Sequence, residues 1–195
     1  MLPIDTRDPA AAARAYLRLE WPLSLGHRYR PRQGCTCDDA DCPTPGAHPL
    51  PEAWPLHCED AIDRALDTMP GAALIAATER FDALILPHRI GMAAMIQLDR
   101  ITPVPCLFYG RCAALLVMPA TGRYAAVRED VEVRTGRDAW IALPPSHDIR
   151  WDTPPWIEPT EKPRPLMHGR DVGEKIAEVF DYSAGYRNDR AEAVR

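Results

Sequence analysis

No uninterrupted apolar stretch of about 20 residues, the length that crosses a bilayer as a helix, occurs in this sequence. The first residues also lack the apolar core of a secretory signal peptide. These two absences argue against a membrane-spanning or an exported protein. We therefore expect a cytoplasmic protein that makes no membrane contact.

The sequence also lacks an excess of basic residues. Lys and Arg number 23 against 28 Asp and Glu, and the formal net charge is −5 at pH 7. The overall field of such a chain does not attract polyanions, so any contact with nucleic acid has to use a local patch. One candidate patch contains Arg28, Arg30 and Arg32, with Tyr29 between them to stack on a base. A solvated basic loop is the alternative interpretation.

Disulfides poorly explain the six cysteines of a chain expected in a reducing compartment. Three of them lie in the segment 34–49, which reads G-C-T-C-D-D-A-D-C-P-T-P-G-A-H-P. The spacing of Cys35, Cys37, Cys42 and His48 suits one structural zinc ion, because proline and glycine let a loop fold four ligands around a point. A disulfide or unconnected thiols are the alternatives.

The other cysteines have less patterned surroundings. His57 and Cys58 are adjacent and offer a substitute metal ligand. Buried or idle thiols are the simpler interpretation. This interpretation applies to Cys58, Cys106 and Cys112.

Apolar spacing and turn residues predict an α+β fold, with a mixed sheet of short strands flanked by helices and the zinc-binding loop 34–49 inserted. Helices are predicted over 10–20, 59–68, 90–98 and 171–180. Strands are predicted over 21–25, 72–77, 83–86, 106–109, 112–118, 124–127 and 139–143. Prolines accumulate from 152 onward, so we divide the chain into a domain over 1–157 and a Pro-rich linker with a C-terminal helix and tail over 158–195. We expect the polar end of this tail to be disordered.

Several motifs follow one another in a recognisable order. An A-R-A-Y-L segment at 13–17 and W-P-L at 21–23 precede the cysteine loop. The segment 70–78 then reads P-G-A-A-L-I-A-A-T, and 131–147 reads V-E-V-R-T-G-R-D-A-W-I-A-L-P-P-S-H. From about residue 10 to 157 the chain resembles the primase-polymerase (prim-pol) domain of the archaeo-eukaryotic primase superfamily, the N-terminal domain of bifunctional DNA primase/polymerases. The resemblance implies a prim-pol-like fold with a cysteine-histidine insertion.

The resemblance also implies a two-metal site that this sequence does not supply. In the family, two acids on the strand after an A-T-G segment and a later Asp in V-D-V-R hold the divalent ions for nucleotidyl transfer. Here no acid lies between Asp82 and Asp99. The acid pair falls instead among Pro87, His88, Arg89 and Ile90, which cannot form an oxygen site for magnesium.

Other family positions have changed as well. Leu115 stands where the family has a histidine that contacts the nucleotide, and Glu79 replaces a glycine. Only Glu132 keeps a carboxylate at a family metal position, and it is equally interpretable as a surface residue paired with Arg134 or Arg111. The sequence therefore predicts a scaffold whose catalytic acids are missing.

Two hypotheses from different classes follow. The first is a catalytically degenerate prim-pol-like domain, a non-enzymatic binding or regulatory module with DNA or a nucleotide as candidate partner. Its candidate phosphate-binding residues are Arg28, Arg30, Arg32, Arg111 and Arg134, with Arg89 and Arg137 as further arginines of the old cleft. A protein partner at the C-terminal tail is also considered, with Trp151, Trp156 and Phe180 as anchors. The second hypothesis is an active DNA primase/polymerase with displaced metal-binding acids, namely Glu79, Asp82, Asp99 and Glu132.

Overall fold

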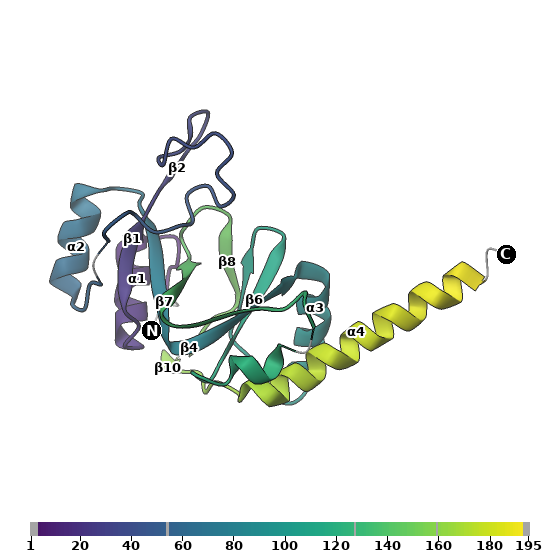
Figure 1. The fold of residues 1–195 in the computed structure, drawn as a ribbon. Coiled ribbons are helices and arrows are strands. Elements are labelled where there is room, and N and C mark those ends of the chain that lie inside the picture. Colours follow the sequence, from purple (N-terminus) through teal and green to yellow (C-terminus); the bar gives the residue numbers. More distant parts are fainter. Residues whose placement is uncertain (1–3, 54, 127, 159, 193–195) are drawn as a thin grey trace.

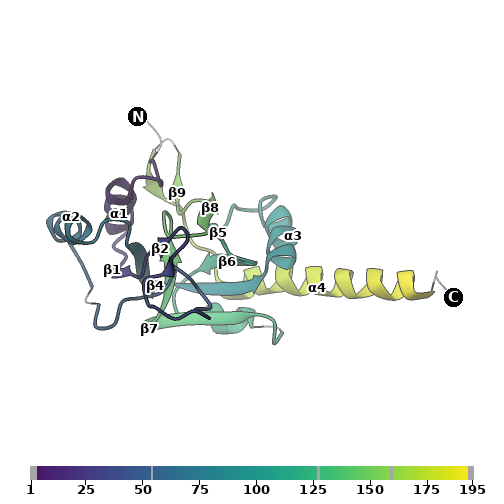
Figure 2. The same ribbon diagram turned by 90° about the horizontal axis from the view of Figure 1, so that it is seen from above.

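Strand β4, Ala73–Pro87, is the central strand of the fold. The structure, a computed structural model, describes residues 4–53, 55–126, 128–158 and 160–192. Strand β7 pairs along one edge of β4, and β1 and β6 share the other edge. Strands β5 and β8 complete the six-stranded sheet, which curls in Figures 1 and 2. The partner strands are β1 (Leu23–Gly26), β5 (Cys106–Tyr109), β6 (Cys112–Val117), β7 (Glu132–Leu143) and β8 (Ile149–Thr153).

The second half of β4 divides the interior into two apolar cores, because successive side chains of a strand point to opposite faces of the sheet. Ala83 and Ile85 belong to the first core, and Leu84 and Leu86 belong to the second. All four side chains are buried. A strand that is buried on both faces reads as a continuous apolar run, as this one does.

Helices cover both cores. Figure 1 shows α1 and α2 at the left of the sheet and α3 and α4 at the right. Among the residues that the structure describes, no helix combines the length and the apolar character that a bilayer crossing requires. The helices are α1 (Pro9–Arg18), α2 (Glu59–Thr68), α3 (His88–Leu98), α4 (Gly169–Glu192) and the short 3₁₀-helix η1 (Gly122–Ala125).

The sequence places the start of α1 correctly. The Asp8 carboxylate accepts a hydrogen bond from the Ala10 N–H at 3.0 Å, and Pro9 occupies the first helical position. Farther along the helix, Arg14 donates to Asp63 of α2 at 2.6 Å. The two helices that cover the first core are thus joined to each other.

Several expectations about the sheet are wrong. The two strands expected over 72–77 and 83–86 are one strand, because β4 continues through an irregularity between Thr78 and Ala83. The strand expected over 139–143 is only the end of β7, whose polar first half is solvent-exposed. All pairs of the described sheet are antiparallel, so it is not a mixed sheet.

Two further expectations concern local structure. The chain over 124–126 ends the 3₁₀-helix η1 and is not a hairpin strand, while position 127 lies outside the described residues. The C-terminal helix is longer than 171–180, and its backbone is helical to Glu192, where a disordered end was expected. Figures 1 and 2 both show the second half of α4 extending away from the sheet.

The beginning of α4 packs into the second core. Val172, Ile176 and Phe180 are buried there beside residues of α3 and β6. Trp156, in the small hairpin of β9 (Trp156–Ile157) and β10 (Lys162–Pro163), is buried in the first core. The aromatic side chains considered as partner anchors therefore pack within the chain itself, with Trp151 partly buried. The division at residue 157 stays a prediction.

Asp82 fixes the irregular part of β4. Its carboxylate is 1% exposed and accepts hydrogen bonds from the Gly122 N–H at 2.7 Å and the Thr135 hydroxyl at 2.6 Å. One buried acid thereby joins β4 to both η1 and β7. Burial of a carboxylate costs free energy unless such donors satisfy it.

We expect Asp82→Ala to lower the free energy of unfolding by about 1.5–3 kcal/mol, the range for hydrogen bonds to a charged group. Urea-induced unfolding measures the change. Glu79→Ala is the control, since Glu79 makes only an exposed 3.5 Å ion pair with Arg137, and its loss should cost less than about 1 kcal/mol. Equal losses for the two variants would contradict the structural role of Asp82.

Candidate metal centre

A hairpin and a long loop bring the four predicted ligands together at one end of β1. The hairpin consists of β2 (Tyr29–Arg30) and β3 (Gly34–Cys35), so the first ligand ends a strand. The loop then returns to β1, where Pro49 bridges Gly26 and the His27 N–H donates to the His48 carbonyl at 2.9 Å. The entry and the exit of the loop are therefore held at the same place.

The four ligand atoms lie close enough together to share one ion. All of them lie within 4.8 Å of one another. The His48 Nε2 atom is 3.3 Å from the Cys35 sulfur and 3.5 Å from the Cys42 sulfur. Bond lengths of about 2.3 Å to sulfur and about 2.0 Å to nitrogen place the ligands of a tetrahedral zinc site about 3.5–3.8 Å apart. The donor set and its distances thus fit a metal such as zinc.

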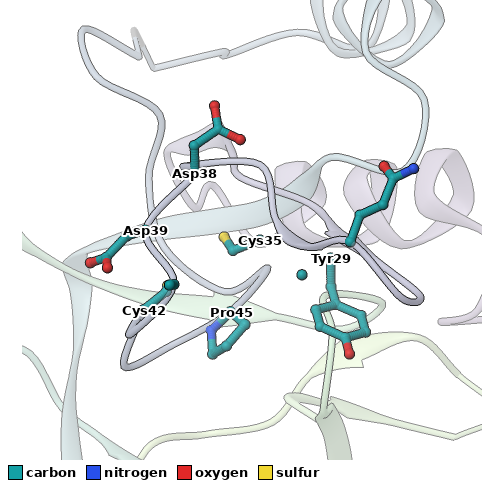
Figure 3. Close-up of a pocket in the computed structure, with 9 residues that line it drawn as sticks. Tyr29, Cys35, Asp38, Asp39, Cys42 and Pro45 are labelled. Atoms are coloured by element: carbon teal, nitrogen blue, oxygen red, sulfur yellow. The ribbon is translucent and has the colours of Figure 1, made fainter.

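The aspartates of the loop are not part of the ligand set. Figure 3 shows the carboxylates of Asp38 and Asp39 pointing outward, away from the Cys35 sulfur. These aspartates line a cavity of about 430 Å³ that also reaches Cys35 and Cys42. This cavity gives an ion from solvent a path to the cluster.

Gly46 lets the loop close. Its φ angle is +67°, and a Cβ atom at this position would lie 2.5 Å from the Tyr29 nitrogen. The Gly46 N–H donates to the Cys35 sulfur at 3.3 Å. The backbone conformation that only glycine adopts easily therefore also orients a ligand.

Residues outside the ligand set hold the cluster in place. The His27 ring stacks on the His48 ring at 4.5 Å between centroids, and the His27 Nδ1 atom contacts the Thr36 hydroxyl at 3.1 Å. The Tyr29 ring stacks on His147 at 3.8 Å between centroids. The sequence analysis did not predict these contacts. The one signal in the sequence is the position of Thr36, between the ligands Cys35 and Cys37. Such supporting contacts orient metal ligands in known sites.

Burial and neighbouring groups set the protonation of the ligands. Burial opposes the thiolate of Cys35, but hydrogen bonds from the Gly46 and Cys37 backbone and from the Cys37 and Cys42 side chains together outweigh it and lower the pKa of this thiol. Burial and the neighbouring thiols raise the pKa of Cys42 to about 11. Burial, and then the proximity of His27, lower the pKa of His48. The imidazole is therefore neutral and ready to ligate near pH 7, while an ion has to displace the Cys42 proton.

The alternatives to a metal site lose support in the structure. All six cysteines are described, and all are free thiols. Cys58 lies exposed before α2, and Cys106 is buried in the sheet; neither these nor Cys112 belongs to the ligand group. Within the described residues, the Cys₃His set is the only group of three or more His, Cys, Asp or Glu side chains placed to share an ion.

The positions that the prim-pol resemblance assigns to catalysis lie in other elements than this centre. Pro87 ends β4 and is exposed, and His88 and Arg89 begin α3. Leu115 is fully buried in β6 and belongs to the second core. None of these four residues offers an oxygen ligand.

Glu132, the acid that the prim-pol resemblance aligns with a metal position, is paired within its own strand. Its carboxylate accepts a hydrogen bond from Arg134 at 2.7 Å, and its cross-strand neighbour on β4 is Ile85. The Arg134 guanidinium also lies 5.5 Å from the Tyr109 ring centroid and 5.2 Å from that of Trp140. Burial opposes its charge, but hydrogen bonds with Glu132 and Tyr109 prevail and raise the pKa of Arg134. A fixed cation therefore neutralises this carboxylate.

The other candidate acids do not gather either. Asp82 is satisfied by backbone and hydroxyl donors, and Glu79 pairs with Arg137. Asp99 is exposed after α3. In the described part of the chain these acids do not form a shared ion site.

The candidate phosphate-binding arginines divide into separate groups. Arg28, Arg30 and Arg32 lie at the β2–β3 hairpin beside the metal centre, with Arg32 in its turn. Arg111 lies in the turn between β5 and β6, and Arg134 is held by its own strand neighbours. The hairpin arginines are thus the only ones of the five that adjoin the Cys₃His cluster.

Comparisons with known proteins add no relative, since no family model, no curated protein and no solved structure matches this chain.

We predict that the purified protein contains about one zinc ion per chain and that Cys37→Ser lowers both the zinc content and the melting temperature, because a closed site stabilises the folded chain. Elemental analysis and thermal unfolding measure the two effects. Cys58→Ser is the matched control, since this exposed thiol lies outside the cluster. A metal-free wild type that melts at the temperature of the zinc-loaded protein would contradict the prediction.

Proposed function

We propose that this chain is a catalytically degenerate prim-pol-like domain that acts as a binding module for nucleic acid or a nucleotide. The observation that carries the proposal is the set of side chains at the positions that align with the metal-binding acids of prim-pol domains. Apolar and basic side chains replace two of the acids, and Arg134 neutralises the third, Glu132. Nucleotidyl transfer by two metal ions needs several free carboxylates around one point.

The Cys₃His centre has a structural role in this proposal. Zinc with four protein ligands has no open position for a substrate or a reactive water. The ion would join β3 to the end of the loop and so fix the hairpin that carries Arg30 and Arg32. Two arginines and the partly exposed Tyr29 suit phosphate and base contacts on a locally basic surface.

An active primase/polymerase with displaced acids is the rival function. It would require the carboxylates of Glu79, Asp82, Asp99 and Glu132 to converge on two metal ions. The hydrogen bonds and positions of these side chains favour the binding module instead.

The first test is a fluorescence titration of the protein with single- and double-stranded DNA at two salt concentrations. We expect binding that weakens as salt rises, because phosphate contacts release counterions from the nucleic acid. Absence of binding at low salt to either DNA and to free nucleotides would overturn the proposal.

The second test is primer extension and de novo priming with magnesium or manganese. We expect the wild type and Glu132→Gln to give the same background signal, because neither holds a carboxylate pair. Activity in the wild type that Glu132→Gln abolishes would instead establish the rival function. Circular dichroism of both proteins controls for folding.

A further inference from the structure

A groove beside the metal centre is lined by basic side chains and by apolar side chains. It has a volume of about 390 Å³ and lies between the end of β1, the β2–β3 hairpin and the C-terminal end of α2. We call it the hairpin groove. This volume falls within the range of about 300–1,000 Å³ that is usual for small-molecule sites.

The basic wall of the groove consists of His27, Arg28 and Arg30. Among the described residues that line it, none is acidic. The cavity beside Cys35, in contrast, is lined by Asp38 and Asp39 and has no cationic wall. The hairpin groove therefore combines a concave shape with one sign of charge, which concentrates anions.

The two arginines keep donors for a ligand. Arg28 uses one N–H on the Pro70 carbonyl at 2.7 Å, which anchors the guanidinium at the groove. Arg30 makes only a 3.4 Å contact with Gln33 in the described part of the chain. Each guanidinium has five N–H donors in a planar fork that matches phosphate oxygens.

Most of the other lining side chains are apolar, although Thr36 and Thr68 also line the groove. The apolar wall consists of Leu50, Met69, Pro70 and Ala72, and Met69 is 38% exposed. A methionine thioether is polarisable and makes favourable contacts with aromatic rings. Such a wall suits a flat heterocycle better than it suits a free inorganic anion.

The metal loop builds the basic wall. Thr36, between Cys35 and Cys37, accepts a hydrogen bond from the Arg28 N–H at 3.1 Å and donates its own N–H to the Arg28 carbonyl at 3.0 Å. His27 stacks on the ligand His48. The backbone of the groove is thus fixed by the same loop that would hold the ion, so metal occupancy and ligand affinity should be coupled.

From these observations we infer that the hairpin groove binds a nucleoside 5′-phosphate unit, free or at the 5′ end of a single strand. The phosphate contacts Arg28 and Arg30, and the base lies against Met69. The inference rests on the proposed function and assigns its site and its ligand class. The groove is too small for a duplex, so a strand would enter by its end.

The test is a fluorescence titration of zinc-loaded protein with a short DNA strand labelled at its 3′ end. The strand carries either a 5′-phosphate or a 5′-hydroxyl. We expect about tenfold tighter binding of the phosphorylated strand, the effect of hydrogen bonds to one charged group. AMP should compete with it, and inorganic phosphate should compete far less. Competition by AMP without a preference for the phosphorylated strand would identify the free nucleotide as the ligand.

Paired variants separate this groove from a diffuse basic surface. Arg30→Gln should weaken binding of the phosphorylated strand, or of AMP where that is the ligand, by about tenfold. Arg100→Gln should change it little, since Arg100 is exposed after α3 and does not line the groove. Met69→Glu should abolish binding by adding an anion, whereas Met118→Glu, at another exposed methionine, should not. Thermal unfolding of each variant verifies its fold.

The outcomes distinguish this inference from the proposed function. Equal losses for Arg30→Gln and Arg100→Gln would overturn the groove and leave the binding module. Failure to bind any strand or AMP would overturn both. If the wild type extends primers and the variants still show the expected binding losses, the groove assignment stands and the non-enzymatic function is overturned.

Discussion

Over 73–76 and 81–86, strand β4 has no solvent-facing side, so other elements have to cover both of its faces. Helices α1 and α2 enclose the first core, and α3, η1 and the start of α4 enclose the second. Where β4 becomes irregular, the same requirement buries Asp82, whose carboxylate is then satisfied by donors from η1 and β7. Burial of one strand on both faces thus explains both the helices around it and the one acid inside.

The metal centre is attached to this scaffold from outside. Its loop begins and ends at β1, which is an edge partner of β4. The Tyr109 hydroxyl of β5 donates to the Ala47 carbonyl at 3.2 Å, and Tyr29 stacks on His147. Because strand β5 and the turn between β7 and β8 hold the loop at these two contacts, the hairpin arginines have a defined position relative to α2. The hairpin groove between the arginines and α2 therefore has a fixed shape.

The sequence predicts local features well and distant contacts poorly. The helices and the strands β5 and β6 follow from apolar spacing and turn residues, and the ligand set follows from four residues within one loop. The first half of β7 was missed because its exposed polar residues carry no strand signal, and η1 because its turn residues also suit a hairpin. Contacts such as Tyr29 with His147 join residues far apart in the chain, and no local pattern indicates them. The burial of Asp82 had one signal in the sequence, because this acid stands alone at the start of an apolar run.

Gly46 divides the ligand set into three thiols before it and one imidazole after it. Its positive φ angle and its contact with Tyr29 leave no room for a side chain. A chain with a larger residue here would retain every donor atom of the site and still fail to gather them, because the last turn of the loop would be displaced. The cysteines and the histidine alone therefore do not determine whether this centre binds a metal. Gly46 is a fifth residue that the site requires.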